Sequence, residues 1–280
     1  MIKPRISVVQ YLNTAPLVWG MLHGAQRGKF RLEFTTPARC ADAVARGQAD
    51  VGIIPSIEVP RMEGTEVVPG ISIASKRLVK SVLLISKVPI DRVRTVAMDN
   101  SSRTSAALVT VLLRRSYGLD FQSAPADPDL EQMLKRADAA LLIGDPALTF
   151  QLEVESQKSK AQDVLVYDLA AEWKKLTARP FVFAVWAGLP EVGLGDFVHD
   201  FQESRDEGLR HLDAIASEWG PRLGLAESAV KLYLAENINY DLDEENLAGL
   251  RLFYKLAEEE GLIPAGKELR LVSQAAMAER

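Results

Sequence analysis

The sequence is poor in the side chains that most often bind metals or act as nucleophiles. Among 280 residues, Cys40 is the single cysteine, and the three histidines are His23, His199 and His211. One cysteine allows no internal disulfide and no multi-cysteine zinc site, and the histidines lack the spacing of metal ligands. No HExxH, GxSxG or phosphate-binding GxxxxGK motif occurs. These absences argue against a metalloprotease, a serine hydrolase of that type and a nucleotide triphosphatase.

The sequence also lacks a basic tract and a long apolar run. Its 33 Lys and Arg against 38 Asp and Glu give a net charge of −5, which disfavours general nucleic-acid binding but leaves room for a small anion pocket. Apolar runs such as Ala139–Ile143 are far shorter than the ~20 residues of a membrane-spanning helix. The first residues, MIKPRISVVQYLN, show no apolar signal region. We expect a cytoplasmic protein that binds neither nucleic acid nor membranes.

Short apolar runs alternate with helical patterns in the first half of the chain. Ile6–Val9 and Asp50–Ile54 have the composition of buried strands. Between them, Thr36 and Pro37 form a typical helix start, and Gly47 follows the last helical residues. Strands separated by helices predict an α/β fold with a mainly parallel sheet.

This strand-and-loop unit occurs twice. Ala49–Ile54 resembles Ala137–Leu142, and the loop at Asn13-Thr14 corresponds to the loop at Ser102–Thr104 at nearly the same spacing. The period is too long for a solenoid repeat. The sequence therefore predicts two similar α/β lobes.

The last third of the chain is dominated by helical patterns. The helix predicted over Asp243–Glu260 is an example, with Gly261 after it. We assign residues 1–90 and 188–280 to the first lobe with its C-terminal helices, and residues 91–187 to the second lobe. Chain crossings near Lys87–Arg92 and Pro180–Ala187 would form a hinge. A ligand would then bind in the cleft, where loops at the carboxyl ends of strands face each other.

The loop from Asp99 to Ser105 is the clearest candidate for ligand binding. It joins a predicted strand to a predicted helix and carries Ser101, Ser102, Thr104 and Ser105 beside Arg103. A helix N-terminus with free N–H groups, hydroxyl donors and a guanidinium suits a carboxylate. The alternative is a well-capped helix with a surface arginine, although capping accounts for one or two hydroxyls and not for four.

Two loops of the first lobe are further candidates. Tyr11, Asn13 and Thr14 follow the first strand, and Asn13 could orient a substrate hydroxyl or carbonyl with its amide; helix capping is the alternative. Ser56 ends a strand, so we expect its side chain to face the cleft. Glu58 is a possible acid or base, although exposed glutamates are common.

Two more candidates lie at the junctions between predicted elements. Ser81 precedes the strand Val82–Ile85 and follows a basic segment that could complement a dianion or could be a solvated loop. Gly144 and Asp145 end a strand of the second lobe. Asp145 could accept a hydrogen bond from a ligand hydroxyl, or it could cap the helix that Pro146 begins.

Six motifs occur in an order that is characteristic of one family. They are Tyr11–Leu17, Ile54–Glu58, Ser81–Ser86, Ser101–Ser105, Leu142–Leu148 and Phe181–Ala187. With these motifs the sequence resembles the chorismate dehydratases of the futalosine route to menaquinone. The resemblance implies a type II periplasmic-binding-protein fold, with two α/β lobes, an inter-lobe cleft and a C-terminal helical segment.

The resemblance also implies a reaction, in which chorismate loses water to give 3-(1-carboxyvinyloxy)benzoate without a metal or an organic cofactor. Chorismate is a dianion, and none of the candidate loops contains histidine. Our hypothesis is that the enolpyruvyl carboxylate of the substrate takes the C3 proton, while Asn13 and Ser81 act as catalytic residues that orient it and support departure of the hydroxyl. The residues expected to bind substrate are Tyr11, Thr14, Ser56, Ser101, Ser102, Arg103, Thr104, Ser105, Gly144 and Asp145.

Two other classes of protein share this fold. A solute-binding protein would only close on its ligand, and the lack of a signal peptide argues against a periplasmic one. A cytoplasmic protein that binds or senses a small anion is the alternative function. The related dihydroxynaphthoate synthases are enzymes, but we expect a Ser-Pro-Cys-Pro-Asn-Asp motif and a catalytic histidine in them. Here the corresponding loop reads Gln10-Tyr11-Leu12-Asn13-Thr14.

Overall fold

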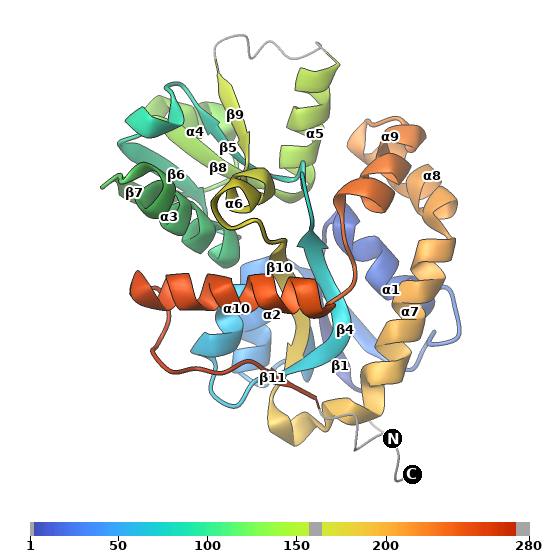
Figure 1. Cartoon of the computed structure of the whole chain (residues 1–280). Coiled ribbons are helices and arrows are strands. Elements are labelled where there is room, and N and C mark those ends of the chain that lie inside the picture. Colours follow the sequence, from blue (N-terminus) through green and yellow to red (C-terminus); the bar gives the residue numbers. More distant parts are fainter. Residues whose placement is uncertain (1–2, 157–163, 273–280) are drawn as a thin grey trace.

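The computed structural model describes residues 3–156 and 164–272, which contain two β-sheets with helices packed around them (Figure 1). The first sheet has the order β11-β4-β10-β3-β1-β2. Its strands are β1 (Arg5–Val9), β2 (Arg31–Thr35), β3 (Val51–Pro55), β4 (Glu66–Ser75), β10 (Phe181–Gly188) and β11 (Arg270–Leu271). The second sheet has the order β7-β6-β8-β5-β9. Its strands are β5 (Val82–Ser86), β6 (Thr95–Asp99), β7 (Gln122–Ala126), β8 (Ala139–Ile143) and β9 (Leu165–Asp168).

The two sheets repeat one pattern of strand pairing. In the first, β1 pairs in parallel with β2 and β3, and β10 runs antiparallel to β3 and β4. In the second, β6 pairs in parallel with β7 and β8, and β5 runs antiparallel to β8 and β9. The strands β3 and β8, whose sequences resemble each other, occupy equivalent positions. The prediction of two similar α/β lobes is confirmed.

The chain crosses between the sheets at other residues than the sequence predicts. Strand β5 was expected in the first lobe, but it pairs with β8 and β9 of the second sheet. Strand β10 was expected in the second lobe, but it pairs with β3 and β4 of the first. The crossings are therefore residues 76–81 and 178–180, rather than Lys87–Arg92 and Pro180–Ala187. The part of the predicted first lobe at 273–280 lies outside the described residues.

Both crossings contain a residue in the left-handed region. Lys80 has φ +60° and Ala178 has φ +58°, and they are the non-glycine residues with positive φ in the described part of the chain. Such a conformation costs a β-carbon-bearing residue roughly 1 kcal/mol. The helical segment that precedes the second crossing is joined to the first crossing, because the Lys174 ammonium donates to the Lys76 carbonyl at 3.0 Å.

Ten α-helices are present in the described residues. They are α1 (Ala15–Leu22), α2 (Pro37–Ala45), α3 (Arg103–Tyr117), α4 (Leu130–Arg136), α5 (Gly144–Glu155), α6 (Leu169–Thr177), α7 (Val198–Arg210), α8 (Leu212–Leu223), α9 (Glu227–Leu232) and α10 (Glu244–Glu259). Their ends follow local sequence signals. Helix α3 ends at Gly118, which adopts φ +63°, and α10 begins after Asp243, whose carboxylate accepts from the Asn246 N–H at 2.8 Å.

The C-terminal helices pack mainly on the first lobe. Helix α7 lies against α1 and β4, while α10 packs on β10 and also contacts α3 of the second lobe, as Figure 1 shows. Two short segments matter for the site, the 3₁₀ turn η1 (Leu12–Thr14) and the π-helical turn η6 (Tyr233–Asn237). The remaining short 3₁₀ helices are η2 (Ser56–Arg61), η3 (Ile90–Arg92), η4 (Pro190–Val192) and η5 (Leu194–Phe197).

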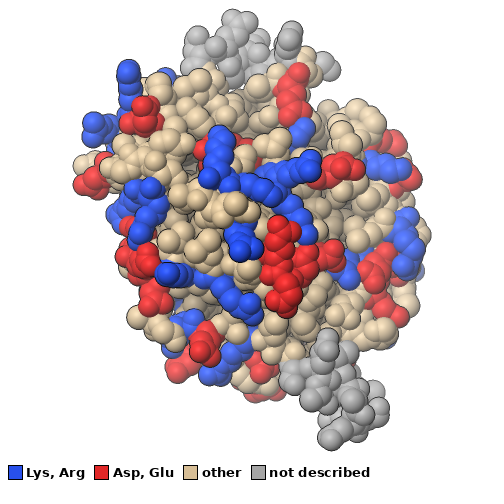
Figure 2. All heavy atoms as spheres, viewed as in Figure 1, with Lys and Arg blue, Asp and Glu red and all other residues tan. Residues whose placement is uncertain are grey.

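The surface carries charges of both signs. Basic and acidic side chains are interspersed over the face seen in Figure 2, and neither sign covers it continuously. Within the described residues, no helix combines the length and the apolar character needed to cross a bilayer.

Candidate active site

The candidate site lies between the lobes, where η1, η2, α3 and α5 begin just beyond β1, β3, β6 and β8. A cavity of about 60 Å³ lies there. It is lined by Val9, Tyr11, Asn13, Pro37, Pro55, Ile73, Val79, Ser81, Val82, Ser102, Thr104, Ser105, Ile143, Gly144, Phe183 and Ala184. The lining side chains come from both lobes, are mostly apolar or hydroxyl-bearing, and include no Asp, Glu, Lys, Arg or His.

Many of the predicted site residues meet at this cavity. Those that line it are Tyr11, Asn13, Ser81, Ser102, Thr104, Ser105 and Gly144. Ser102 is the N-cap of α3, yet its side chain makes no capping hydrogen bond. Thr14, Ser56, Ser101, Arg103 and Asp145 do not line the cavity.

Ser56 does not face the cleft, contrary to the expectation from its place at a strand end. Its hydroxyl is fully buried and donates to the carbonyl of Val182 on β10 at 2.7 Å. Its own carbonyl accepts a hydrogen bond from the Tyr254 hydroxyl at 2.7 Å. These partners lie far away in the sequence, so the local pattern around Ser56 gives no sign of them.

Arg103 is engaged by carboxylates of its own chain. Its guanidinium donates to Glu58 at 3.0 Å and to Asp42 at 2.8 Å, so it joins α3 of the second lobe to η2 and α2 of the first. Glu58 also accepts from Arg61 at 2.7 Å. The expectation that Arg103 grips a substrate carboxylate in the cavity finds no support in this position. Its two ion pairs hold the lobes together instead.

Other hydrogen bonds also cross the cleft. The Leu12 N–H donates to Asp145 at 2.9 Å, the Ala38 N–H donates to the Ser101 carbonyl at 3.1 Å, and the Ile57 N–H donates to the Thr104 hydroxyl at 3.2 Å. The lobes are therefore closed on each other. A cavity of about 60 Å³ holds a few waters, whereas a molecule of the size of benzene needs roughly 150 Å³. An aromatic ligand must part the lobes to enter.

Two carboxyl groups near the cavity are shielded from solvent, Asp99 being buried and Asp145 half-buried. Burial raises the pKa of Asp145 to about 6, opposed by the hydrogen bond from the Leu12 N–H. Burial also raises the pKa of Asp99, although the Ser101 hydroxyl and N–H donate to one carboxylate oxygen at 2.6 and 2.9 Å. Because Ser101 donates to Asp99, its oxygen accepts the Tyr11 hydroxyl, 3.4 Å away. Asp99 thus orients groups at the rim of the cavity.

Gly144 allows the lobes to approach closely at this point. Its φ is +65°, and a β-carbon there would lie 2.7 Å from the ring of Tyr11. A side chain at position 144 would thus push Tyr11 away, in addition to straining the backbone. Glycine at this position is required by the contact between the lobes.

Ser81 and Asn13 have a neighbour that the sequence reasoning did not identify. The Tyr233 hydroxyl donates to Ser81 at 2.8 Å, and its side chain is buried. The Thr14 hydroxyl donates to the Asn13 side-chain oxygen at 3.3 Å. Tyr233 lies in η6, in the helical segment to which the motif comparison gave no role. No local motif marks it.

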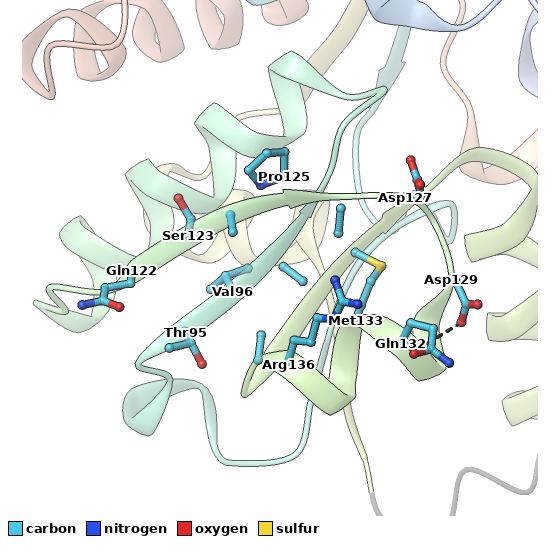
Figure 3. A pocket seen from close by; sticks show the side chains of 14 residues that line it. Thr95, Val96, Gln122, Ser123, Pro125, Asp127, Asp129, Gln132, Met133 and Arg136 are labelled. Atoms are coloured by element: carbon cyan, nitrogen blue, oxygen red, sulfur yellow. Dashed lines mark hydrogen bonds between the residues drawn. The ribbon is translucent and has the colours of Figure 1, made fainter.

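A larger cavity, of about 520 Å³, lies on the second sheet over β6 and β7, beside α4 (Figure 3). It is lined mainly by alanines and by polar side chains such as Gln122, Gln132 and Arg136. It contains none of the predicted site residues and lies within one lobe. Its size alone does not make it the site, because its polar side chains come from one lobe and not from the facing loops of both lobes. Among the described residues, no group of three or more His, Cys, Asp or Glu is placed to hold a metal ion.

Comparisons with known proteins place the chain in a family. A family described as menaquinone biosynthesis matches residues 4–259. The chain is 30% identical over 261 residues to the chorismate dehydratase of Thermus thermophilus, covering 89% of this chain and 93% of that protein.

Among solved structures, a protein from Archaeoglobus fulgidus has a TM-score of 0.73 at 18% identity, covering 93% of this chain and 98% of that one. The periplasmic aliphatic sulphonate binding protein of Escherichia coli has a TM-score of 0.64 at 15% identity, covering 97% and 94%. At such identity the likeness concerns the fold alone, and it confirms the two-lobed periplasmic-binding-protein architecture. On the family match and the identity to the Thermus protein, this chain belongs to the menaquinone biosynthesis family.

Proposed function

We propose that this protein is a chorismate dehydratase, a hydro-lyase that converts chorismate to 3-(1-carboxyvinyloxy)benzoate and water in the futalosine route. The observation that carries the proposal is the convergence of Asn13, Ser81 and the hydroxyls of α3 on one cavity between the lobes. The family match and the Thermus relative support the same substrate. The proposal implies a cytoplasmic enzyme whose partner is chorismate and which needs no cofactor.

The reaction breaks the C3–H and C4–O bonds of chorismate and forms a C3–C4 double bond that completes an aromatic ring. The proton and the hydroxyl leave together as water, so no oxidant or reductant is needed. Aromatisation drives the elimination. The protein has to orient the dianion, accept the C3 proton and support the departing hydroxyl.

The cavity lining favours the substrate as its own base. Its polar side chains are those of Tyr, Asn, Ser and Thr, none of which is an effective base near neutral pH. We therefore assign proton acceptance to the enolpyruvyl carboxylate of chorismate. Asn13 orients that carboxylate, and Ser81 donates to the hydroxyl that leaves.

The N-terminus of α3 suits the other carboxylate. Ser102, Thr104 and Ser105 lie there, and each is buried at the cavity. Helix α3 has 15 residues, and the free N–H groups of its first turn favour an anion. Arg103 contributes through closure of the lobes, by its ion pairs with Glu58 and Asp42.

The test is incubation of the purified protein with chorismate, followed by separation of the products by mass and absorbance. We expect a product lighter by one water with the spectrum of a substituted benzoate. Asn13→Ala should lose most of the turnover at saturating chorismate. The matched control is Asn100→Ala, since Asn100 is exposed on the loop after β6 and does not line the cavity. Full turnover by Asn13→Ala would remove the assigned role of the amide.

A second candidate is a cytoplasmic protein that binds or senses a small anion without catalysis. The observation in its favour is the fold shared with the sulphonate binding protein. Unchanged chorismate together with a raised melting temperature would support this candidate and contradict the dehydratase proposal.

A further inference from the structure

Tyr233 reaches the cleft from the C-terminal segment. It is the first residue of η6, a π-helical turn that follows α9, and single π-helical turns are frequent at functional sites. Its ring is 2% exposed, and its hydroxyl lies behind Ser81, outside the residues that line the cavity. Tyr233 thus does not line the cavity, but it contacts a side chain that does.

The direction of the hydrogen bond defines what Ser81 can do. Tyr233 donates to the Ser81 oxygen at 2.8 Å, so that oxygen acts as an acceptor. The Ser81 proton is directed toward the Val79 carbonyl at 3.4 Å, which is long for an O–H···O bond, usually about 2.7–2.8 Å. A ligand oxygen in the cavity can therefore take this proton as a better acceptor. Hydrogen bonds in such a chain strengthen one another, which makes Ser81 a stronger donor.

We propose that Tyr233 is a positioning residue, whose hydroxyl holds Ser81 so that the serine O–H is aimed at the hydroxyl leaving the substrate. This inference rests on the proposed function. Tyr233 supplies no net proton, because burial raises the pKa of its hydroxyl and hydrogen bonding to Ser81 and Asn13 only opposes that rise. Asp145 and Asp168 are the charged groups that act on it, and both disfavour a phenolate.

Tyr240 provides a matched control. It is a buried tyrosine of the same segment, 4% exposed, and its hydroxyl has no hydrogen-bond partner among the described residues. Tyr233→Phe and Tyr240→Phe remove the same atom from similar surroundings. A general effect of losing a buried hydroxyl would appear in both variants, whereas a role through Ser81 would appear only in Tyr233→Phe.

The experiment is a double-mutant cycle of Tyr233→Phe and Ser81→Ala, measured as kcat and KM for chorismate. Removing one hydrogen bond to the serine should lower kcat about tenfold and change KM less than about twofold. The double variant should be no slower than Ser81→Ala, since Tyr233 acts through that serine. Tyr240→Phe should keep the kcat of the unaltered protein, and melting temperatures show that each variant is folded.

Two results would overturn the inference. One is an unchanged kcat in Tyr233→Phe, and the other is an equal loss from Tyr233→Phe with and without Ser81. If the proposed function is wrong, the protein without substitutions leaves chorismate intact, and this result is distinct from the two above. In that case the same cycle is measured as the Kd for chorismate by calorimetry, where additivity, or no binding at all, overturns the role of Tyr233.

Discussion

Replacing Asp145 by asparagine is the sharpest test of the electrostatics of the closed cleft. The carboxyl is half-buried, and one of its oxygens accepts the Leu12 N–H from the other lobe at 2.9 Å. Burial raises its pKa from 3.8 to about 6. The asparagine side chain has no charge at any pH, and its amide oxygen can accept the same hydrogen bond. The substitution therefore removes the cost of burying a charge and keeps the contact between the lobes.

The raised pKa of Asp145 determines the sign and the size of the change in the free energy of unfolding. The folded state binds this proton more tightly than the unfolded state, so the free energy of unfolding falls as the pH rises from about 4 to about 6 and stays lower above that. A rise of about 2 pKa units corresponds to about 3 kcal/mol. Compared with the unaltered protein, Asp145→Asn should gain about 1.6 kcal/mol at pH 5 and about 3 kcal/mol at pH 8.

Urea unfolding at pH 5 and pH 8 measures this difference. The control is Asp120→Asn, because Asp120 is exposed on the loop between α3 and β7; a surface substitution of this kind should change stability by less than ~0.5 kcal/mol at either pH. A gain for Asp145→Asn that is the same at both pH values would refute the reasoning. So would a variant that is less stable at pH 8.

Gly144→Ala and Arg103→Ala test how the lobes meet, and Gly118→Ala is the control for the first. Gly118→Ala places a side chain at φ +63° with nothing within 4 Å, whereas Gly144→Ala at φ +65° also meets the Tyr11 ring at 2.7 Å. Unfolding curves should give a loss of about 1 kcal/mol for Gly118→Ala, and only Gly144→Ala should also weaken chorismate binding; equal behaviour would contradict the close contact. Arg103→Ala removes the ion pairs to Glu58 and Asp42, so binding should weaken about fivefold and X-ray scattering should show a larger radius of gyration. An unchanged radius and an unchanged Kd would contradict the role of these ion pairs in closure.

Local patterns predicted most of the individual elements. Residues Ile6–Val9 form a strand, Gly47 follows a helix with positive φ, and the helix predicted over Asp243–Glu260 is α10. Apolar runs, caps and terminal glycines act within a few residues, so they can be identified in a single sequence.

Long-range partners could not be predicted in this way. Strands β5 and β10 exchange sheets because each pairs antiparallel with strands distant in the sequence. The Ser56 hydroxyl donates to the Val182 carbonyl, and the Arg103 guanidinium donates to Glu58. These partners are also distant in the sequence. Tyr233 belongs to a segment without a recognisable motif. The motifs thus contain several of the residues that meet at the cavity, but the partner of each side chain depends on the packing of the two lobes.

The cleft separates the groups that close it from the groups that face a ligand. The titratable side chains Arg103, Glu58 and Asp145 take part in contacts between the lobes, while the cavity itself is lined by amide, hydroxyl and apolar groups. We therefore expect a change of pH around 6 to act first on closure, through Asp145. If chorismate supplies its own base, the chemical step adds no further protein pKa near neutrality. The pH profile of kcat/KM should then follow the opening and closing of the lobes, and Asp145→Asn should flatten it around pH 6.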